Sequence, residues 1–453
     1  MNLSQIENLV TNAKQIFFIG IGGISMSSLA VITKNNGKDV KGSDRTESAL
    51  TQKMEICGIE ISYEHKAENV HGASLVVYTA AVSDTNPEML EADRLGIPKL
   101  SRAEYLGYLM SSYKNRIGVS GTHGKSSVTS MLAEIYMAGG YDPTVVSGAE
   151  LSSIGGAYRI GNNENFIFEA CEYCDSFLSF YPTTAVVTNV EYDHADYFRD
   201  MEQMRESFRK YVNIAQNAVL NADDPETLDL RKHFNGKAVT FSIKGNGDYN
   251  AENIVYKNGC ASFDIVKDNE TLCAVTLRVV GEHNVKNALC AAAAAFENGV
   301  DSKAVRDGLN AFKGAKRRFE YMGKTESGAE VYNDYAHHPS ELKAVLGAAK
   351  ALNKRIISVF QPHTYSRTAS LFCDFVQSFE NSDITVFADI YAARETDTLG
   401  MSAQLLAQKT PRSIYVGSNE NIAEYLKKSA GRNDIVLILG AGDIVKLGNM
   451  IVK

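Results

Sequence analysis

The sequence lacks several features that would assign it to a class of protein directly. It has no run of Lys and Arg, and its 46 basic residues are outnumbered by 54 acidic ones, giving a formal net charge of −8. A non-specific nucleic-acid binder needs a surplus of positive charge, so the charge balance argues against that class. No window reaches about 18 apolar residues, and residues 1–10 lack the basic start and apolar run of a secretory signal. We therefore expect a cytoplasmic protein without a membrane-spanning helix.

Cysteine is also scarce, with seven residues scattered along the chain. An odd, dispersed set fits reduced thiols better than a disulfide framework. Cys171 and Cys174 form a CxxC, but a zinc site needs further close ligands and a redox site needs the motif to open a helix after a strand. We interpret this pair as incidental.

What remains is a long chain of ordinary globular composition. Its 453 residues are 44% hydrophobic and 22% charged, which allows sizeable cores to form. At roughly 100–200 residues per domain, about three domains are expected. The sequence contains no internal repeat and no low-complexity segment, and changes in its pattern place the domains at 1–107, 108–313 and 314–453.

Apolar runs alternate with helical patterns in all three segments, which predicts an α/β fold with mostly parallel sheets. The first domain is expected to be Rossmann-like, with a strand at 15–20, a glycine turn and a helix from about 25 to 35. The second opens with a strand at 116–121 and contains short alternating runs at about 238–280, which are typical of a small antiparallel insertion. The third is again Rossmann-like, with strands expected at 356–360, 385–390, 413–417 and 435–443.

A glycine-containing loop, GVSGTHGKSS (118–127), joins an expected strand to an expected helix. This arrangement directs backbone N–H groups at an anion. The general pattern GxxxxGK[ST] requires glycine at 119, where this chain has Val119, so the match is confined to 121–126. We expect Lys125 to bind the β- and γ-phosphates of ATP and Ser126 to offer its hydroxyl to Mg²⁺ or Mn²⁺. A helix N-terminus contributes only about 0.3–1 kcal/mol, so catalysis needs further groups.

Carboxylates and a histidine follow two later strands. Glu169 ends one strand, and Asp193, His194 and Asp196 follow the next. In open parallel sheets, ligands bind at the carboxyl edge of the strands. We therefore expect a metal or γ-phosphate contact there, with a simple turn histidine as the alternative for His194.

Longer motifs resemble the bacterial Mur ligases over essentially the whole chain, in order. The first domain is similar to the family's uridine-nucleotide domain and the third to its amino-acid-binding domain, while the second resembles its nucleotide domain. The motifs are GIGGISMSSLA (20–30), GSD (42–44) and AAVSDTNPE (80–88); GTHGKSS (121–127), EACEYCDSFL (169–178), TNVEYDHADYF (188–198) and GEHNVKNAL (281–289); RRFE (317–320), DYAHHPSE (334–341), FQPHTYSRT (360–368) and LGAGDI (439–444).

The resemblance implies an ATP-driven ligase in peptidoglycan precursor synthesis. The lactyl carboxylate of UDP-N-acetylmuramate would be phosphorylated, and the amine of L-alanine would attack the acyl phosphate. Domain closure is expected because water must be kept from that intermediate. Whether the chain forms a homodimer stays open, as do its strictness for L-alanine over glycine or serine and the identity of the general base.

The resemblance also implies roles for individual residues. Catalytic roles fall to Lys125, Glu169, His194 and Arg367, with Ser126, Glu169 and His194 as metal ligands. The other implied ATP contacts are Gly121, Thr122, His123, Gly124, Ser127, His283, Asn284 and Asn287. The implied UDP-substrate contacts are Gly20, Gly22, Gly23, Ser43, Asp44 and Arg318, and the amino acid would meet Tyr335, His337, His363 and Arg367, whose planar fork suits a carboxylate.

This chain departs from the family at two places. Ser126 replaces the usual Thr and keeps the hydroxyl, whereas the acidic run after Glu169 is altered to Cys171, Glu172, Tyr173 and Cys174. The second change leaves open which acid completes the metal shell. We assign no carbamylated lysine.

Several of these motifs also fit simpler interpretations or other functions. Without the resemblance, His337 and His338 before a proline indicate a helix start, Arg317 and Arg318 a solvated charge pair, and Asn284 and Asn287 helix capping. A ligase that recycles a murein tripeptide is the nearest alternative, against which FQPHTYSRT argues. An NAD-dependent dehydrogenase built on the GIGG turn and Asp44 would have no use for Lys125, and a non-catalytic scaffold would not need the full set of catalytic residue types.

Overall fold

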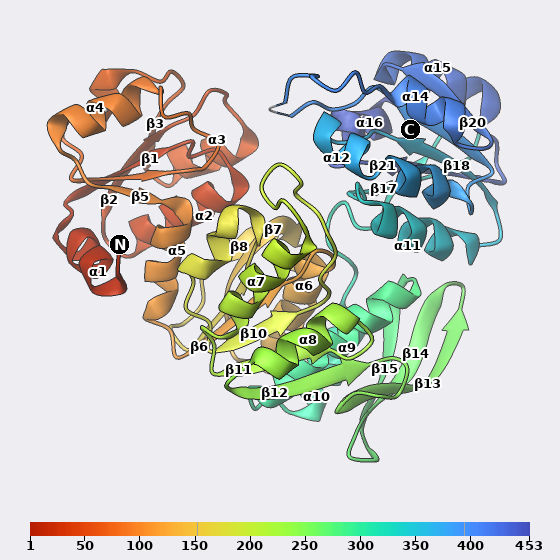
Figure 1. Ribbon diagram of the computed structural model, residues 1–453, viewed down its shortest axis with the longest axis horizontal. Helices are drawn as coiled ribbons and strands as arrows, with labels where there is room; N and C mark the ends of the chain where they lie inside the picture. The colour runs from red at the N-terminus through yellow and green to blue at the C-terminus, as the bar shows by residue number, and fades with distance from the viewer. Residues whose placement is uncertain (152, 394) are drawn as a thin grey trace.

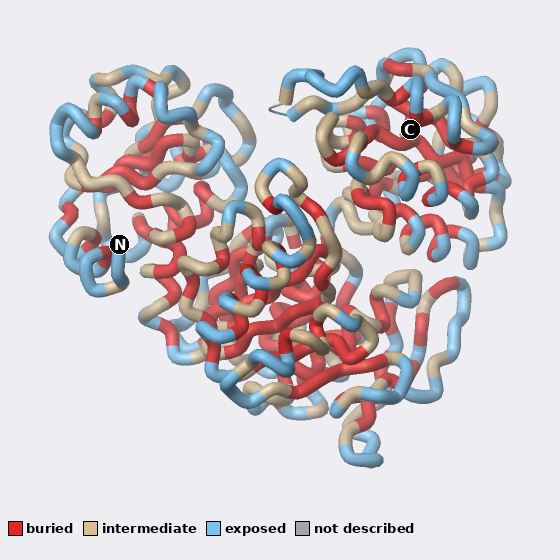
Figure 2. Tube along the Cα trace, viewed as in Figure 1, coloured by how far each residue is buried: buried red, intermediate tan, exposed pale blue. Residues whose placement is uncertain are grey.

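The computed structural model describes residues 1–151, 153–393 and 395–453. Three sheets form three lobes along the chain, the N-terminal and C-terminal lobes lying on either side above the central one (Figure 1). Buried residues concentrate inside each lobe (Figure 2). The expected three-domain α/β class is confirmed.

The N-terminal sheet has five parallel strands in the order β3-β2-β1-β4-β5. Its central strand β1 is buried at residues 16–19, as expected for a strand covered on both faces. The strands are β1 (Gln15–Ile19), β2 (Asp39–Ser43), β3 (Glu60–Ser62), β4 (Leu75–Tyr78) and β5 (Lys99–Ser101), and the helices are α1 (Leu3–Asn12), α2 (Ile24–Asn35), α3 (Ala49–Ile56), α4 (Pro87–Leu95) and α5 (Arg102–Ser111).

The central sheet has ten strands in the order β15-β14-β13-β12-β11-β10-β6-β9-β7-β8. The strands are β6 (Asn115–Ser120), β7 (Thr144–Leu151), β8 (Gly156–Arg159), β9 (Asn165–Glu169), β10 (Thr184–Val187), β11 (Asn217–Asn221), β12 (Lys237–Ser242), β13 (Tyr249–Lys257), β14 (Cys260–Lys267) and β15 (Glu270–Val280). The helices are α6 (Lys125–Ala138), α7 (Met201–Val212), α8 (Pro225–His233), α9 (Glu282–Glu297) and α10 (Ser302–Ala311).

The expected antiparallel insertion is present as β13–β15, but it continues the central sheet. Phe241 and Ser242 of β12 pair in parallel with Tyr249 and Asn250 of β13, so the parallel and antiparallel parts share one backbone ladder. The fully buried alanines 291–295 let α9 pack closely, and α9 contacts both α6 and strands of this extension. The insertion is therefore fixed to the part of the domain that contains α6 and α9.

The C-terminal sheet has six strands in the order β16-β17-β21-β18-β19-β20, parallel except for β16 at one edge. The strands are β16 (Glu320–Lys324), β17 (Glu330–Asp334), β18 (Arg355–Phe360), β19 (Ile384–Ala388), β20 (Ser413–Gly417) and β21 (Asp434–Leu439), and the helices are α11 (Pro339–Lys350), α12 (Tyr365–Ser370), α13 (Phe372–Val376), α14 (Ala403–Lys409), α15 (Asn419–Ser429) and α16 (Lys446–Ile451).

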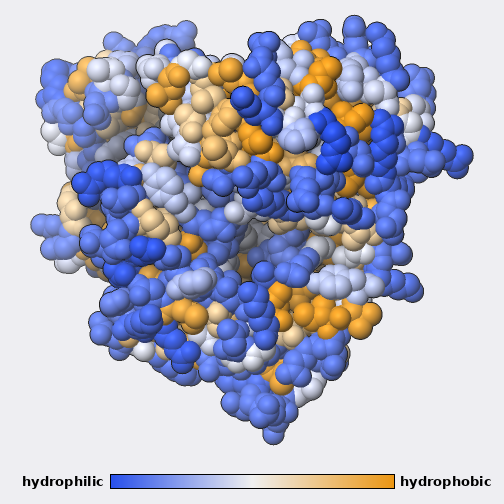
Figure 3. All heavy atoms as spheres, turned by 45° about the vertical axis from the view of Figure 1, so that its right-hand side comes forward, coloured by the Kyte–Doolittle hydropathy of each residue, from blue (hydrophilic) through white to orange (hydrophobic). Residues whose placement is uncertain are grey.

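The surface is mostly hydrophilic on the face shown in Figure 3, and it is hollowed near its centre. Among the described residues, no helix combines the length and the apolar character needed to cross a membrane.

Candidate active site

The phosphate loop lies between β6 and α6, and glycine is required at two of its positions. Gly121 has φ +127°, and a Cβ there would stand 2.1 Å from Thr188 Oγ1. Gly124, at the start of α6, has φ +86°, and a Cβ would stand 2.6 Å from Asn287 Oδ1. Because both positions combine positive φ with close neighbours, the loop can take this shape only with these glycines.

The segment that follows β10 holds the loop in place. Thr122 donates its hydroxyl to Glu191 O at 2.9 Å, and the His123 N–H donates to Asn189 Oδ1 at 2.9 Å. Thr188 donates its hydroxyl to His123 O at 2.6 Å. We had assigned no roles to Thr188, Asn189 and Glu191, although the motif TNVEYDHADYF contains all three.

Lys125 is held by the carboxylate of Glu172, a residue of the altered acidic run that follows Glu169. Its Nζ lies 3.2 and 3.1 Å from the two carboxylate oxygens of Glu172 and donates to two loop carbonyls. The Glu172 side chain is only 1% exposed. Burial alone lowers the pKa of Lys125, but the charges and hydrogen bonds around it, with Glu172 foremost, together outweigh burial and raise that pKa. Burial raises the pKa of Glu172, but Lys125 and His194 together outweigh it and lower that pKa. Both groups are therefore charged.

His194 reaches the same carboxylate. Its Nε2 lies 3.6 Å from Glu172 Oε1, and its ring lies against Tyr173 with centroids 4.8 Å apart. The residue has φ +56°, a backbone conformation uncommon outside glycine. Glu172 thus brings Lys125 and His194 together across two loops.

Glu169 lies beside the phosphate loop because β9 pairs in parallel with β6. Glu169 is the register partner of Val119, and its Oε1 accepts from the Ser147 hydroxyl and the Gly148 N–H, both at 2.7 Å. Ser126 and Ser127 lie in the first turn of α6. The hydroxyl and carboxylate oxygens at this edge are ligands that suit Mg²⁺.

A cavity of about 540 Å³ extends from the loop, a size typical of ligand pockets. His123, Gly124 and Ser127 line one part, and His283, Asn284 and Asn287 of α9 line another. Asn284 Nδ2 donates to Val280 O at 2.8 Å, and burial lowers the pKa of His283 to about 4, so this ring is neutral. The structure thus brings together the residues expected to bind ATP.

Arg318 lines the same cavity, whereas we expected it to contact the UDP substrate. Its Nη1 lies 3.5 Å from Glu341 Oε1 on α11. Glu341, which we had not singled out although it ends the motif DYAHHPSE, therefore also belongs to this wall of the cavity.

The residues expected to bind the amino acid form one chain of contacts in the C-terminal domain. Ring centroids of Tyr335 and His337 are 5.3 Å apart, and those of His337 and His363 are 5.9 Å apart. Burial lowers the pKa of His337 to about 3 and that of His363 to about 4, so both rings are neutral. The Nδ1 atom of His363 can then accept from Arg367 Nη1, which lies 3.1 Å away.

Arg367 is also bound from the central domain. Its Nε donates to Asp193 Oδ1 at 2.8 Å and its Nη2 to Asp193 Oδ2 at 3.3 Å, with both side chains buried. Burial raises the pKa of Asp193, but the charge of Arg367, its hydrogen bond and the nearby His194 together outweigh burial and lower that pKa well below its usual range. The pair joins the segment after β10 to α12, and we had not anticipated this role for Asp193.

The glycine turn after β1 is closed by groups at the end of β2. The Gly20 N–H donates to Ser43 O at 2.8 Å, and the Gly22 N–H donates to Asp44 Oδ2 at 2.8 Å. Gly23 caps α2. The Ser43 hydroxyl is buried and donates to Glu88 Oε2 at 2.8 Å, so it faces a fully buried carboxylate.

Burial raises the pKa of the Cys171 thiol to about 11. A thiolate, which zinc binding and redox chemistry both require, is therefore disfavoured at this residue.

The chain matches three family models that together cover most of its length. They are described as Mur ligase family, catalytic domain (residues 15–114), Mur ligase middle domain (119–295) and Mur ligase, glutamate ligase domain (317–442).

Curated relatives match at full length. A UDP-N-acetylmuramate--L-alanine ligase of Clostridium novyi (strain NT) is 44% identical and covers 98% of both chains, and one of Acetivibrio thermocellus is 45% identical over 97% of this chain and 96% of its own. The crystal structure of a UDP-N-acetylmuramate-alanine ligase from Thermotoga maritima superposes with a TM-score of 0.81 at 29% identity, covering 96% of this chain and 97% of the other. A murein peptide ligase from Psychrobacter arcticus, at 23% identity and a TM-score of 0.73, shares the fold.

Proposed function

Because this chain belongs to the Mur ligase family, we infer that it is an ATP-dependent ligase joining UDP-N-acetylmuramate to L-alanine in peptidoglycan precursor synthesis. One observation supports this function most directly. The Asp193–Arg367 pair connects the domain that carries the phosphate loop to the domain that carries the expected amino-acid site. The pair therefore brings the expected site of ATP, the phosphoryl donor, next to the expected site of the amino acid, whose amine accepts the acyl group.

The reaction couples two displacements. A lactyl carboxylate oxygen attacks the γ-phosphorus and ADP leaves; the amine of L-alanine then attacks the acyl carbon and phosphate leaves with that oxygen. Lys125 neutralises charge on the transferred phosphoryl group, and the neutral rings of His337 and His363 line the acceptor side. Closure around the acyl phosphate keeps water out.

Ser126, Glu169 and His194 are the residues that would hold a divalent ion. Ser126 and Glu169 offer oxygen ligands, which fit Mg²⁺, and the imidazole of His194 also suits Mn²⁺. When bound, such an ion offsets the charge that develops during phosphoryl transfer. Glu172, already paired with Lys125 and His194, is the acid next to this set.

Substrates are divided among the domains 1–107, 108–313 and 314–453. The glycine turn at Gly20, Gly22 and Gly23 receives the UDP diphosphate on the first, at the N-terminus of α2, and Asp44 supports this turn by accepting from the Gly22 N–H. The acceptor is bound on the third by the Tyr335–His337–His363–Arg367 chain of contacts. Such a reaction belongs in the cytoplasm, where ATP and soluble sugar nucleotides are present.

The test is phosphate release from ATP and Mg²⁺ with each substrate omitted in turn. We expect release only with both UDP-N-acetylmuramate and an amino acid, and the highest kcat/KM for L-alanine. Release that does not depend on the sugar nucleotide would overturn the proposal. A higher kcat/KM for a murein tripeptide would instead assign the recycling reaction.

A further inference from the structure

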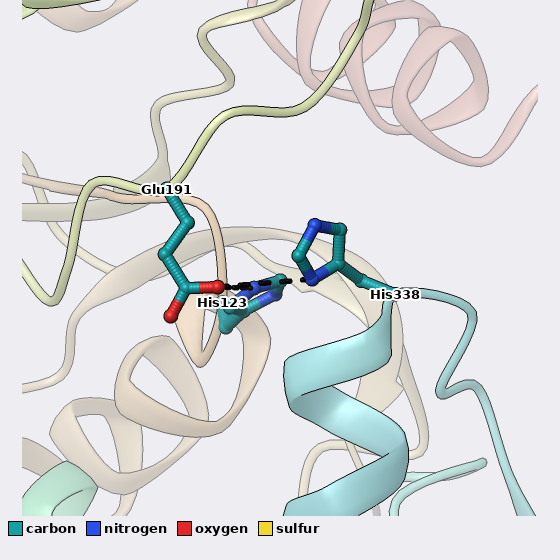
Figure 4. A group of neighbouring side chains, drawn as sticks. All are labelled: His123, Glu191 and His338. Atoms are coloured by element: carbon teal, nitrogen blue, oxygen red, sulfur yellow. Dashed lines mark hydrogen bonds and ion pairs between the residues drawn. The ribbon is translucent and has the colours of Figure 1, made fainter. Parts of the chain in front are cut away.

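A group of three side chains outside the expected metal ligands lies where the central and C-terminal domains meet. His123 comes from the phosphate loop, Glu191 from the segment after β10, and His338 from the N-cap of α11 (Figure 4). One ligand atom from each lies within 4.8 Å of the other two. Two imidazoles and one carboxylate are a ligand set that zinc enzymes use.

The distances between these ligand atoms are already close to those around a tetrahedrally coordinated metal ion. Bonds of about 2.0–2.1 Å place two tetrahedral ligand atoms about 3.3 Å apart. The His123 Nε2 atom lies 3.3 Å from Glu191 Oε2, and the His338 Nδ1 atom lies 3.7 Å from the same oxygen. Only small side-chain shifts are needed for all three to reach one ion.

Neighbouring groups orient these ligands. His123 Nδ1 lies 3.3 Å from Glu341 Oε1, so this carboxylate can hold the Nδ1 proton. Burial lowers the pKa of His123, but Glu341 and Glu191 together outweigh it and raise that pKa to about 9, so an ion that binds Nε2 displaces the proton there. Glu191 Oε2 accepts from the Ser340 hydroxyl. A carboxylate behind a histidine ligand is the usual support at zinc sites, where it fixes the tautomer and the ring orientation.

His338 presents a lone pair to the same space. Its Nδ1 accepts from the Ser340 N–H at 3.3 Å, so the proton of the neutral ring is on Nε2. That Nε2 is buried without a hydrogen-bond partner among the described residues, and the side chain is 6% exposed. Exchanging a long hydrogen bond for a metal bond requires no deprotonation of this ring.

We propose that His123, Glu191 and His338 bind a zinc-class divalent cation that ties α11 to the phosphate loop. Three protein ligands leave a fourth position for water or for an oxygen of a cavity ligand, since His123 and Glu191 line the nucleotide cavity. Mg²⁺ does not suit this site because it prefers six oxygen ligands. The site borders the nucleotide cavity, but binding of the cation needs no substrate.

The test uses Co²⁺ as the probe, titrated into the full-length, nucleotide-free protein and followed by visible d–d absorption. We expect one tight site of tetrahedral intensity. His338→Ala and Glu191→Gln, in different domains, should each weaken binding more than tenfold, and Glu341→Gln by about 10–100-fold because it removes the support behind His123. Zn²⁺ should displace Co²⁺ and raise the melting temperature of the unmodified protein but not of His338→Ala.

Two variants control for other sites. His71→Ala removes a surface histidine that also pairs with a carboxylate, Glu91, at 2.9 Å, and should leave Co²⁺ affinity unchanged. His194→Ala should also leave it unchanged. Affinity that is lost in His194→Ala but retained in His338→Ala and Glu191→Gln would place the ion elsewhere and overturn the proposal. Thiolate charge-transfer bands, or no tight site at all, would overturn it as well.

Discussion

Replacing Arg367 by lysine should weaken L-alanine binding much more than it slows turnover. An arginine offers five N–H groups. The Nε and one Nη2 hydrogen serve Asp193, and Nη1 faces both the Nδ1 and the carbonyl of His363. This leaves one Nη2 hydrogen free for a substrate carboxylate, and the Nη1 contact to the carbonyl, at 3.4 Å, is long enough to be exchanged for a second one. A lysine ammonium has three N–H donors but no planar fork. Asp193 would pair with this ammonium, which leaves no bidentate contact for the substrate carboxylate.

The magnitude follows from the hydrogen bonds lost. Hydrogen bonds to charged groups contribute about 1.5–3 kcal/mol, and lysine keeps the charge but loses the bidentate geometry. We therefore expect the KM for L-alanine to rise about 10–100-fold, since about 1.4 kcal/mol corresponds to a factor of ten. The KM values for ATP and UDP-N-acetylmuramate should change little.

The assay is phosphate release against L-alanine concentration, with the other two substrates saturating. Arg412→Lys is the matched control, because Arg412 lies in the same domain, on the surface, and donates to the Glu380 carbonyl. An unchanged KM for L-alanine in Arg367→Lys would remove Arg367 from this role. A fall in kcat alone would contradict the reasoning as well.

Three other substitutions have defined outcomes. Lys125→Ala should abolish phosphate release while the circular dichroism spectrum is kept; near-full turnover would refute its role. Glu172→Gln should lower kcat at least about tenfold, because a neutral amide no longer holds the charged Lys125, and an unaltered kcat would refute this. Burial raises the pKa of Glu297, but hydrogen bonds from two lysines and a tyrosine outweigh it and lower that pKa to about 2. Its stabilisation is therefore present above about pH 4.5 and lost as the pH falls toward 2. Glu297→Gln should cost about 3 kcal/mol in urea unfolding at pH 7 and somewhat less than half of that at pH 3; equal costs would contradict the assignment.

The sequence predicted individual strands better than the way in which strands join into sheets. Residues 435–439 are apolar throughout, and β21 is buried at every residue, so its type follows from composition alone. The pairing of Phe241 with Tyr249, which joins the antiparallel strands to the central sheet, depends on a turn geometry that periodicity does not encode. The edge hairpin β7–β8 was missed because its short second strand has no clear alternation.

Local motifs likewise predicted only part of the site. The phosphate loop was recognisable because Gly121, Gly124 and Lys125 are close in sequence. The pairing of Asp193 with Arg367 spans 174 positions, and that of Lys125 with Glu172 spans 47, so neither could be derived from spacing. Both depend on how loops at the sheet edge and the two domains come together.

In the proposed reaction, the chain activates a carboxylate with ATP before it forms an amide bond. UDP-N-acetylmuramate labelled with ¹⁸O in its lactyl carboxylate, incubated with ATP, Mg²⁺ and L-alanine, tests it most directly by mass spectrometry of the products. We predict that one ¹⁸O appears in each phosphate released and the other remains in the amide of UDP-N-acetylmuramoyl-L-alanine. Phosphate free of ¹⁸O, with both labels left in the unreacted sugar nucleotide, would contradict the account.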